Sequence, residues 1–124
     1  MKETEEILST PIWNQAELLE RVDNDLELLR ELLIIYKAEF PRTIQSLQSA
    51  VAGGELKNTA SLSHSLKGML SNLGGGRAAA AAEKLEELAV AGENALLKEA
   101  LDTLQREAAR LLPELDAYMM EVRH

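Results

Sequence analysis

Three groups of glycines divide most of the chain into segments of helical length. Gly53-Gly54, Gly74-Gly75-Gly76 and Gly92 stand where runs of apolar residues, repeating every three or four positions, come to an end. Glycine often ends a helix because it adopts the left-handed backbone conformation without steric penalty. Aromatic residues make up only 3% of the chain, and strand-forming clusters of Val, Ile, Thr and Tyr are missing. The sequence therefore predicts an all-α fold, an up-and-down antiparallel bundle with short connections.

The apolar spacing predicts six helical segments. Asn14, with Glu17 three residues later, resembles a capping box that opens the first, and Asp23 or Asp25 can cap the second. Pro41 is expected to kink or break that second helix. The remaining segments are expected at residues 44–51, 55–73 and 77–91, and from 94 to the C-terminus with a bend at Pro113. Residues 1–10 are expected to form a loose segment and residues 11–124 a single helical domain.

Composition excludes several classes of function. The chain has 124 residues and no cysteine, so a disulfide framework and a thiolate metal site are both excluded. It shows no secretory signal and no apolar run of roughly 18 residues that could span a membrane. The net charge of −8 argues against nucleic acid and anionic membranes as partners. We expect a soluble, cytoplasmic monomer.

The acidic residues are unevenly distributed along the chain. Between Phe40 and Ala82 the only acidic residue is Glu55, whereas the basic residues there are Arg42, Lys57, Lys67 and Arg77. Chance in an Ala- and Gly-rich stretch is one explanation. The other is that an anionic group must sit against the middle of the protein without repulsion.

The segment at residues 55–73 carries one histidine on its polar side. At about 100° per residue, His64 lies about 160° from Leu66 on the helical wheel. It therefore faces solvent if the apolar stripe faces the core. The stripe consists of Thr59, Leu62, Leu66, Met69, Leu70 and Leu73.

Two neighbours of His64 set it apart from an ordinary surface histidine, which is the alternative interpretation. Gly68 lies one turn away inside the helix, where glycine costs about 1 kcal/mol relative to alanine, and it leaves an open patch beside the imidazole. Lys67 places an ammonium about 5–6 Å away, where it stabilises each unit of phosphoryl charge by about 1–3 kcal/mol. Neutral imidazole is a competent nucleophile near neutral pH. These features together indicate a phosphoryl carrier.

The same residues resemble the signature of a known family. The stretch from Ser63 to Gly68, followed by Leu73-Gly74, is similar to the His-x-Leu-Lys-Gly motif of histidine-containing phosphotransfer (HPt) domains, with a second glycine ten residues after the histidine. The resemblance extends over roughly residues 12–110, from the lead-in at 19–23 to Leu85-Glu86 in the following helix. The chain departs from the family at Met69-Leu70, where small residues are usual, and we expect a change of packing there.

The resemblance implies a four-helix antiparallel bundle with one or more additional short N-terminal helices. It implies that His64 accepts a phosphoryl group from a receiver-domain aspartate and donates it to another receiver, with Lys67 neutralising charge and Gly68 permitting docking. Glu86 is the candidate for a hydrogen bond to Nδ1 of His64, which would leave Nε2 as the nucleophile. The receiver would supply Mg²⁺, so no cofactor or metal is expected in this chain. The other polar residues on the His64 face are expected to contact the partner: Lys57, Ser61 and Ser71.

Three other functions are compatible with a helical bundle of this size. An acid/base or hydrolytic enzyme using His64 lacks a nucleophile elbow and metal-ligand histidines. A helical adaptor that binds a receiver or kinase without carrying phosphate would have the same fold and composition. The intact set of His64, Lys67 and Gly68 argues against it. A phospho-acceptor module of a larger sensor kinase remains open, although no ATP-binding segment is present. We therefore expect a phosphocarrier rather than an enzyme, with receiver domains and a hybrid sensor kinase as partners.

Overall fold

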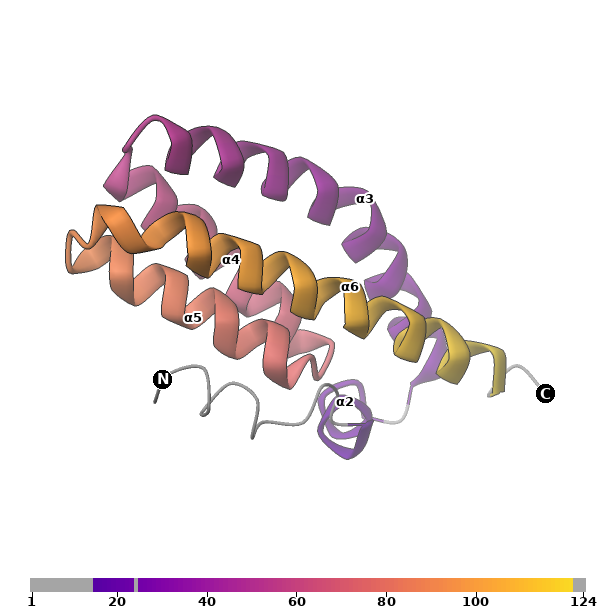
Figure 1. Cartoon of the computed structure of the whole chain (residues 1–124). Coiled ribbons are helices and arrows are strands. Elements are labelled where there is room, and N and C mark those ends of the chain that lie inside the picture. The colour runs from indigo at the N-terminus through magenta and orange to yellow at the C-terminus, as the bar shows by residue number, and fades with distance from the viewer. Residues whose placement is uncertain (1–14, 24, 122–124) are drawn as a thin grey trace.

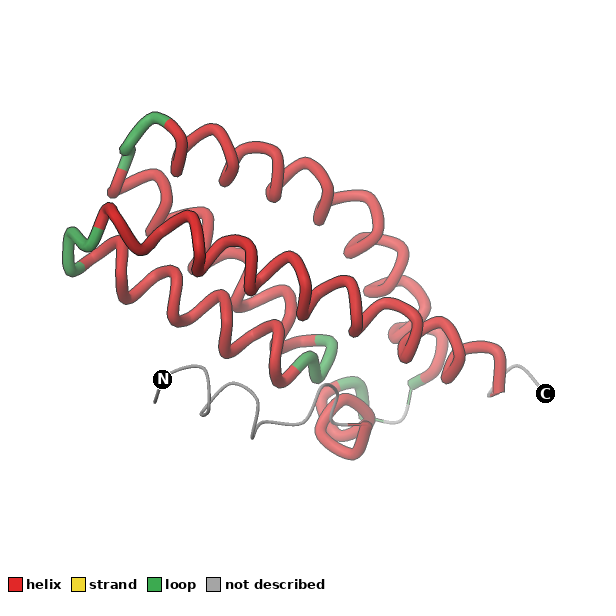
Figure 2. Tube along the Cα trace, in the orientation of Figure 1, coloured by secondary structure: helices red, strands yellow, loops and turns green. Residues whose placement is uncertain are grey.

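The computed structural model describes residues 15–23 and 25–121, and the described part is helical with short turns (Figures 1 and 2). It contains no β-strand within those ranges. The expected loose segment at residues 1–10, and Asn14 of the capping box, lie outside the described residues. The elements are α2 (Gln15–Arg21), α3 (Leu26–Ala52), α4 (Leu56–Asn72), α5 (Gly76–Val90), the 3₁₀ helix η1 (Asn94–Leu96) and α6 (Leu97–Glu121).

Helices α3 to α6 form the predicted up-and-down bundle, so the expected all-α fold is confirmed. Each helix packs against the next, and α6 closes the bundle against α3. Helices α4 and α5 share the most extensive contact of any pair. Helices α3 and α6 have 27 and 25 residues, against 17 and 15 for α4 and α5. They therefore extend together beyond the shorter pair (Figure 1).

The core is built almost entirely from Leu and Ala, as the composition predicts. The short helix α2 contributes Leu18 and Val22, so it belongs to the same core as the long helices. Full burial of one such leucine stabilises the fold by about 1.5–3 kcal/mol. The largest fully buried apolar side chains are Leu18, Leu29, Leu47, Leu66, Leu70, Leu73, Leu85, Leu97, Leu104, Leu111 and Leu115.

The glycine clusters end the helices by one shared backbone pattern. After α4, Gly74 has a φ of 69°, and the N–H of Gly75 donates to the carbonyl of Leu70 at 2.9 Å. This is a Schellman motif, which satisfies carbonyls that the helix leaves unpaired and requires the left-handed conformation that glycine tolerates. The same hydrogen-bond pattern ends α3 at Gly54 and α5 at Gly92.

Gly75, which follows the left-handed Gly74, is required for close packing. A Cβ at this position would lie 2.6 Å from Cδ2 of Leu111 and 3.2 Å from the carbonyl oxygen of Leu70. We predict that Gly75→Ala lowers the free energy of unfolding by about 1–3 kcal/mol, the usual range for overpacking a core. Urea unfolding followed by circular dichroism measures it, with Gly68→Ala as the control because its Cβ meets nothing within 4 Å. Equal stability of Gly75→Ala and the parent would contradict the packing account.

Of the kink or break expected at Pro41, the break is wrong: α3 runs unbroken through it, and residues 44–51 are part of the same helix and not a separate segment. Proline removes one backbone hydrogen bond and costs about 3 kcal/mol inside a helix. Burial of Tyr36, Ile44 and Leu47 on both sides of it offsets that penalty. Helix α6 likewise continues through Pro113.

None of the helices in the described ranges is long and apolar enough to cross a bilayer.

Candidate functional site around His64

His64 stands near the middle of α4 with its ring in solvent. Thr59, Leu66 and Leu70 of the same helix are buried and fix its rotation, whereas the His64 side chain is 71% exposed. The predicted exposure of His64 is therefore confirmed. Ser63, beside it, is fully buried and its hydroxyl donates to the Thr59 carbonyl at 2.7 Å. His64 is thus presented on a helix whose opposite face is packed into the core.

Glu86 of α5 holds one nitrogen of the ring. Its Oε2 lies 3.1 Å from Nδ1 of His64, and the Glu86 side chain is only 25% exposed. An ionised carboxylate can only accept a hydrogen bond, so Nδ1 carries the proton in this arrangement. In the neutral ring, Nε2 is then left with its lone pair directed away from Glu86.

Lys67 lies on the flank of His64, one turn along α4, and faces a second acid of α5. Its Nζ is 3.6 Å from Oε1 of Glu83, with the two side chains 35% and 50% exposed. That separation exceeds the 2.7–2.9 Å typical of a charge-assisted hydrogen bond. Glu83 was not among the site residues predicted from the sequence. The available signal was its spacing, because Glu83 and Glu86 are three residues apart on α5, as His64 and Lys67 are on α4.

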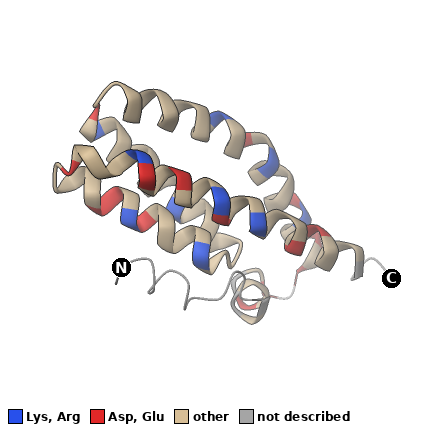
Figure 3. Ribbon diagram, viewed as in Figure 1, with Lys and Arg blue, Asp and Glu red and all other residues tan. Residues whose placement is uncertain are grey.

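The surroundings of His64 are not free of negative charge, contrary to the inference from the acid-poor stretch at residues 40–82. That inference considered neighbours along the chain only. Packing of α5 against α4 brings Glu86 to His64 and Glu83 to Lys67. The second half of α3, which lies within the same stretch, carries no charged side chain beyond Arg42 (Figure 3).

Gly68 leaves the surface beside His64 open. It is exposed, and a Cβ built on it would meet no atom within 4 Å. The other predicted contact residues follow the same side of α4. Lys57 and Ser61 are exposed, and Ser71 is half-buried.

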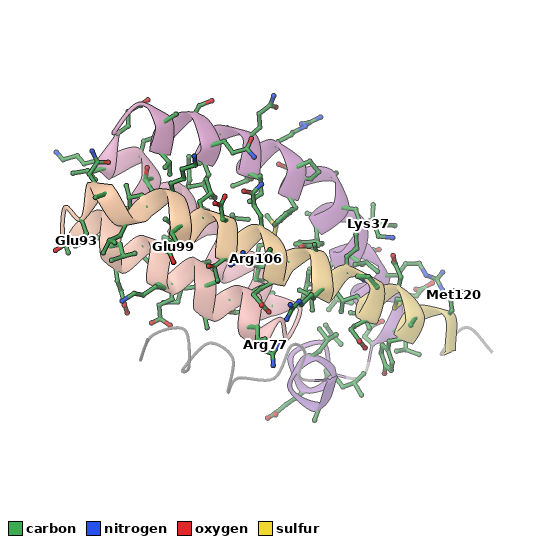
Figure 4. The ribbon with its side chains drawn as sticks, viewed as in Figure 1. Lys37, Arg77, Glu93, Glu99, Arg106 and Met120 are labelled. Carbon is green, nitrogen blue, oxygen red and sulfur yellow. The ribbon has the colours of Figure 1, made fainter. Side chains whose placement is uncertain are left out.

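Arg77, which the sequence placed among the basic residues of the middle stretch, lies at the first turn of α5 and serves the fold (Figure 4). Its Nη1 is 3.9 Å from Oε2 of Glu107 on α6. Glu107 is only 4% exposed, and its Oε1 lies 3.5 Å from Nη1 of Arg110. A buried carboxylate needs such partners because desolvation of an unpaired charge is costly. Glu107 gave no signal in the sequence.

Among the described residues, no three His, Asp or Glu side chains are grouped so that they could hold a metal ion.

Comparison with known proteins agrees with the geometry. The family model for the Hpt domain matches residues 16–117. Among solved structures, the chain is similar to histidine-containing phosphotransfer protein B (HptB) from Pseudomonas aeruginosa PAO1, with 23% sequence identity and a TM-score of 0.74. That match covers 90% of this chain and 96% of HptB. No curated protein matches the chain significantly.

An all-helical bundle that presents an exposed histidine from the middle of one helix is the arrangement that the resemblance to histidine-containing phosphotransfer domains predicts. Because the family model covers most of its length, this chain belongs to the Hpt domain family.

Proposed function

We propose that His64 accepts a phosphoryl group from the aspartate of a response-regulator receiver domain and passes it to another receiver in a His-Asp phosphorelay. The observation that carries this proposal is the state of the imidazole. The His64 side chain is 71% exposed, and Glu86 engages Nδ1, so that Nε2 is free for attack. The relay is proposed to operate in the cytoplasm, with the chain as a monomeric phosphocarrier and not a kinase.

The proposed transfer needs little from this chain beyond a positioned nucleophile. The lone pair of Nε2 attacks phosphorus, the P–O bond to the aspartate breaks, and the carboxylate leaves with the electron pair. The ring retains the proton on Nδ1 and so becomes positively charged. Glu86 then faces a cation at 3.1 Å, which stabilises the phosphorylated ring.

The partner is proposed to complete the site. The receiver would bring the acidic pocket and the Mg²⁺ that neutralises phosphoryl charge, and the exposed ring of His64 can enter such a pocket. Lys67 supplies a cation beside the phosphoryl group, and Gly68 gives clearance one turn from the ring. Lys57, Ser61 and Ser71 extend the proposed contact surface along α4. A hybrid sensor kinase that carries a receiver is a further proposed partner.

The experiment that tests this function is a two-step chase of label. A ³²P-labelled candidate receiver is mixed with the chain, the free receiver is removed, and a second receiver is then added. We expect acid-labile label to appear on the chain and then on the second receiver. A receiver that binds the chain but transfers no label, across a panel of receivers, would instead identify a non-phosphorylated adaptor.

Replacement of Glu86 tests its proposed role in orienting the ring. We predict that Glu86→Ala loses the Nδ1–H tautomer preference and slows phosphoryl acceptance about tenfold, because a hydrogen bond to a charged group contributes about 1.5–3 kcal/mol. Glu86→Gln keeps an acceptor oxygen and should restore much of the tautomer preference. Ring ¹⁵N chemical shifts report the tautomer directly. A parent protein that already holds the Nε2–H tautomer would refute the assignment of Nε2 as nucleophile.

A further inference from the structure

We infer that Glu83 holds Lys67 away from the phosphoryl group and so limits how readily His64 is phosphorylated. This inference rests on the proposed function of His64. The two acids of α5 would then act in opposite directions, although they are only one turn apart. Glu86 favours the phosphorylated ring, and Glu83 opposes it.

The geometry pairs each acid with a different member of the site. Glu86 contacts the ring nitrogen that keeps its proton, whereas Glu83 contacts the ammonium of Lys67. On phosphorylation the ring becomes positive, so the negative charge of Glu86 faces an increased positive charge. The phosphoryl group itself is doubly negative and needs the same ammonium that Glu83 engages.

The ion pair between Lys67 and Glu83 is weak enough to be broken during the reaction. Its atoms are 3.6 Å apart and its side chains are 35% and 50% exposed. Exposed ion pairs of this kind are weak, and the ammonium sits on a flexible four-carbon stem. Lys67 can therefore leave Glu83 for a phosphoryl group at Nε2 of His64, at the expense of that ion pair.

Two other roles for Glu83 predict different effects of its removal on the rate of His64 phosphorylation. If Glu83 positioned Lys67 for the reaction, its removal would slow phosphorylation. If Glu83 acted only by direct repulsion of the phosphoryl group, its removal would speed the reaction whether or not Lys67 was present. Competition for Lys67 predicts a faster reaction that depends on Lys67.

Phosphoramidate tests this without a receiver, because Nε2 attacks its phosphorus directly and ammonia leaves with the electron pair of the broken N–P bond. The rate of phosphohistidine formation is followed by ³¹P NMR. We expect Glu83→Gln to react about two- to fivefold faster than the parent, the range that release of an exposed ion pair allows. The gain should shrink at about 1 M salt, where the Debye length is about 3 Å.

Four variants complete the experiment. Glu86→Gln makes the same charge change one turn away and should react more slowly. Glu114→Gln removes one negative charge from α6, which lies diagonally across the bundle from α4, and this variant should react at the parental rate. Lys67→Gln/Glu83→Gln should react no faster than Lys67→Gln alone. The inference is overturned if Glu83→Gln reacts more slowly than the parent, or if it raises the rate equally in the parent and in Lys67→Gln. In either case, phosphohistidine formed on the parent still supports the proposed function. A parent that forms no phosphohistidine overturns both.

Discussion

His64→Gln is expected to abolish phosphoryl acceptance and to leave the fold intact. Glutamine has no nucleophilic ring nitrogen, so no phosphoramidate bond can form at position 64. The side chain is 71% exposed, and its one hydrogen bond within the described residues is to Glu86, which water can replace. The free energy of unfolding should therefore stay within about 1 kcal/mol of the parent. Label transferred from a phosphorylated receiver and a urea unfolding curve measure the two effects.

Ser65→Ala is the matched control for His64→Gln. Ser65 is an exposed hydroxyl next to the histidine, whereas Ser63 on the other side is buried and bonded to Thr59. We expect Ser65→Ala to accept label at the parental rate. Acid-stable label on His64→Gln at a normal rate would place the acceptor on a hydroxyl and would refute the assignment.

Gly68→Gln is expected to slow phosphotransfer about a hundredfold without unfolding the protein. The glycine is exposed and nothing lies within 4 Å of an added Cβ, so the fold can accept a side chain there. That side chain would stand one turn from His64, in the space through which the receiver must approach. A displacement of about 1 Å can cost about a hundredfold in a reaction that depends on alignment of the attacking atoms.

Gly68→Ala separates folding from docking at the same position. Alanine is the better helix former, so the free energy of unfolding should rise by up to about 1 kcal/mol. Its small methyl group should slow transfer far less than glutamine does. Melting curves and transfer rates are compared for both variants. A glutamine variant that transfers as fast as the parent would show that Gly68 gives no docking clearance, and an unfolded one would show that it serves helix packing.

The fold was predictable from local signals because the three turns of the bundle depend on local chemistry. Gly54, Gly74 and Gly92 each take the left-handed conformation that ends a helix, and each stands where the sequence predicts an end. Pro41 misled the prediction because its local penalty is outweighed by burial along α3, which depends on helices distant in sequence.

The site was predictable where one helix contains it, and less so where two helices meet. The helical wheel places His64, Lys67 and Gly68 correctly because all three lie on α4. Glu86 became a candidate through the family resemblance. Glu83 was missed because its contact with Lys67 depends on how α5 packs against α4, which no spacing within α4 reveals.

The central claim is that Nε2 of His64 carries the phosphoryl group. The most direct measurement is an NMR spectrum of the chain phosphorylated by a receiver, with ¹⁵N-labelled histidine and ³¹P detection. The account predicts ³¹P–¹⁵N coupling to Nε2 of His64, with the proton retained on Nδ1 toward Glu86. Phosphorus coupled to Nδ1, or found on any residue other than His64, would contradict it.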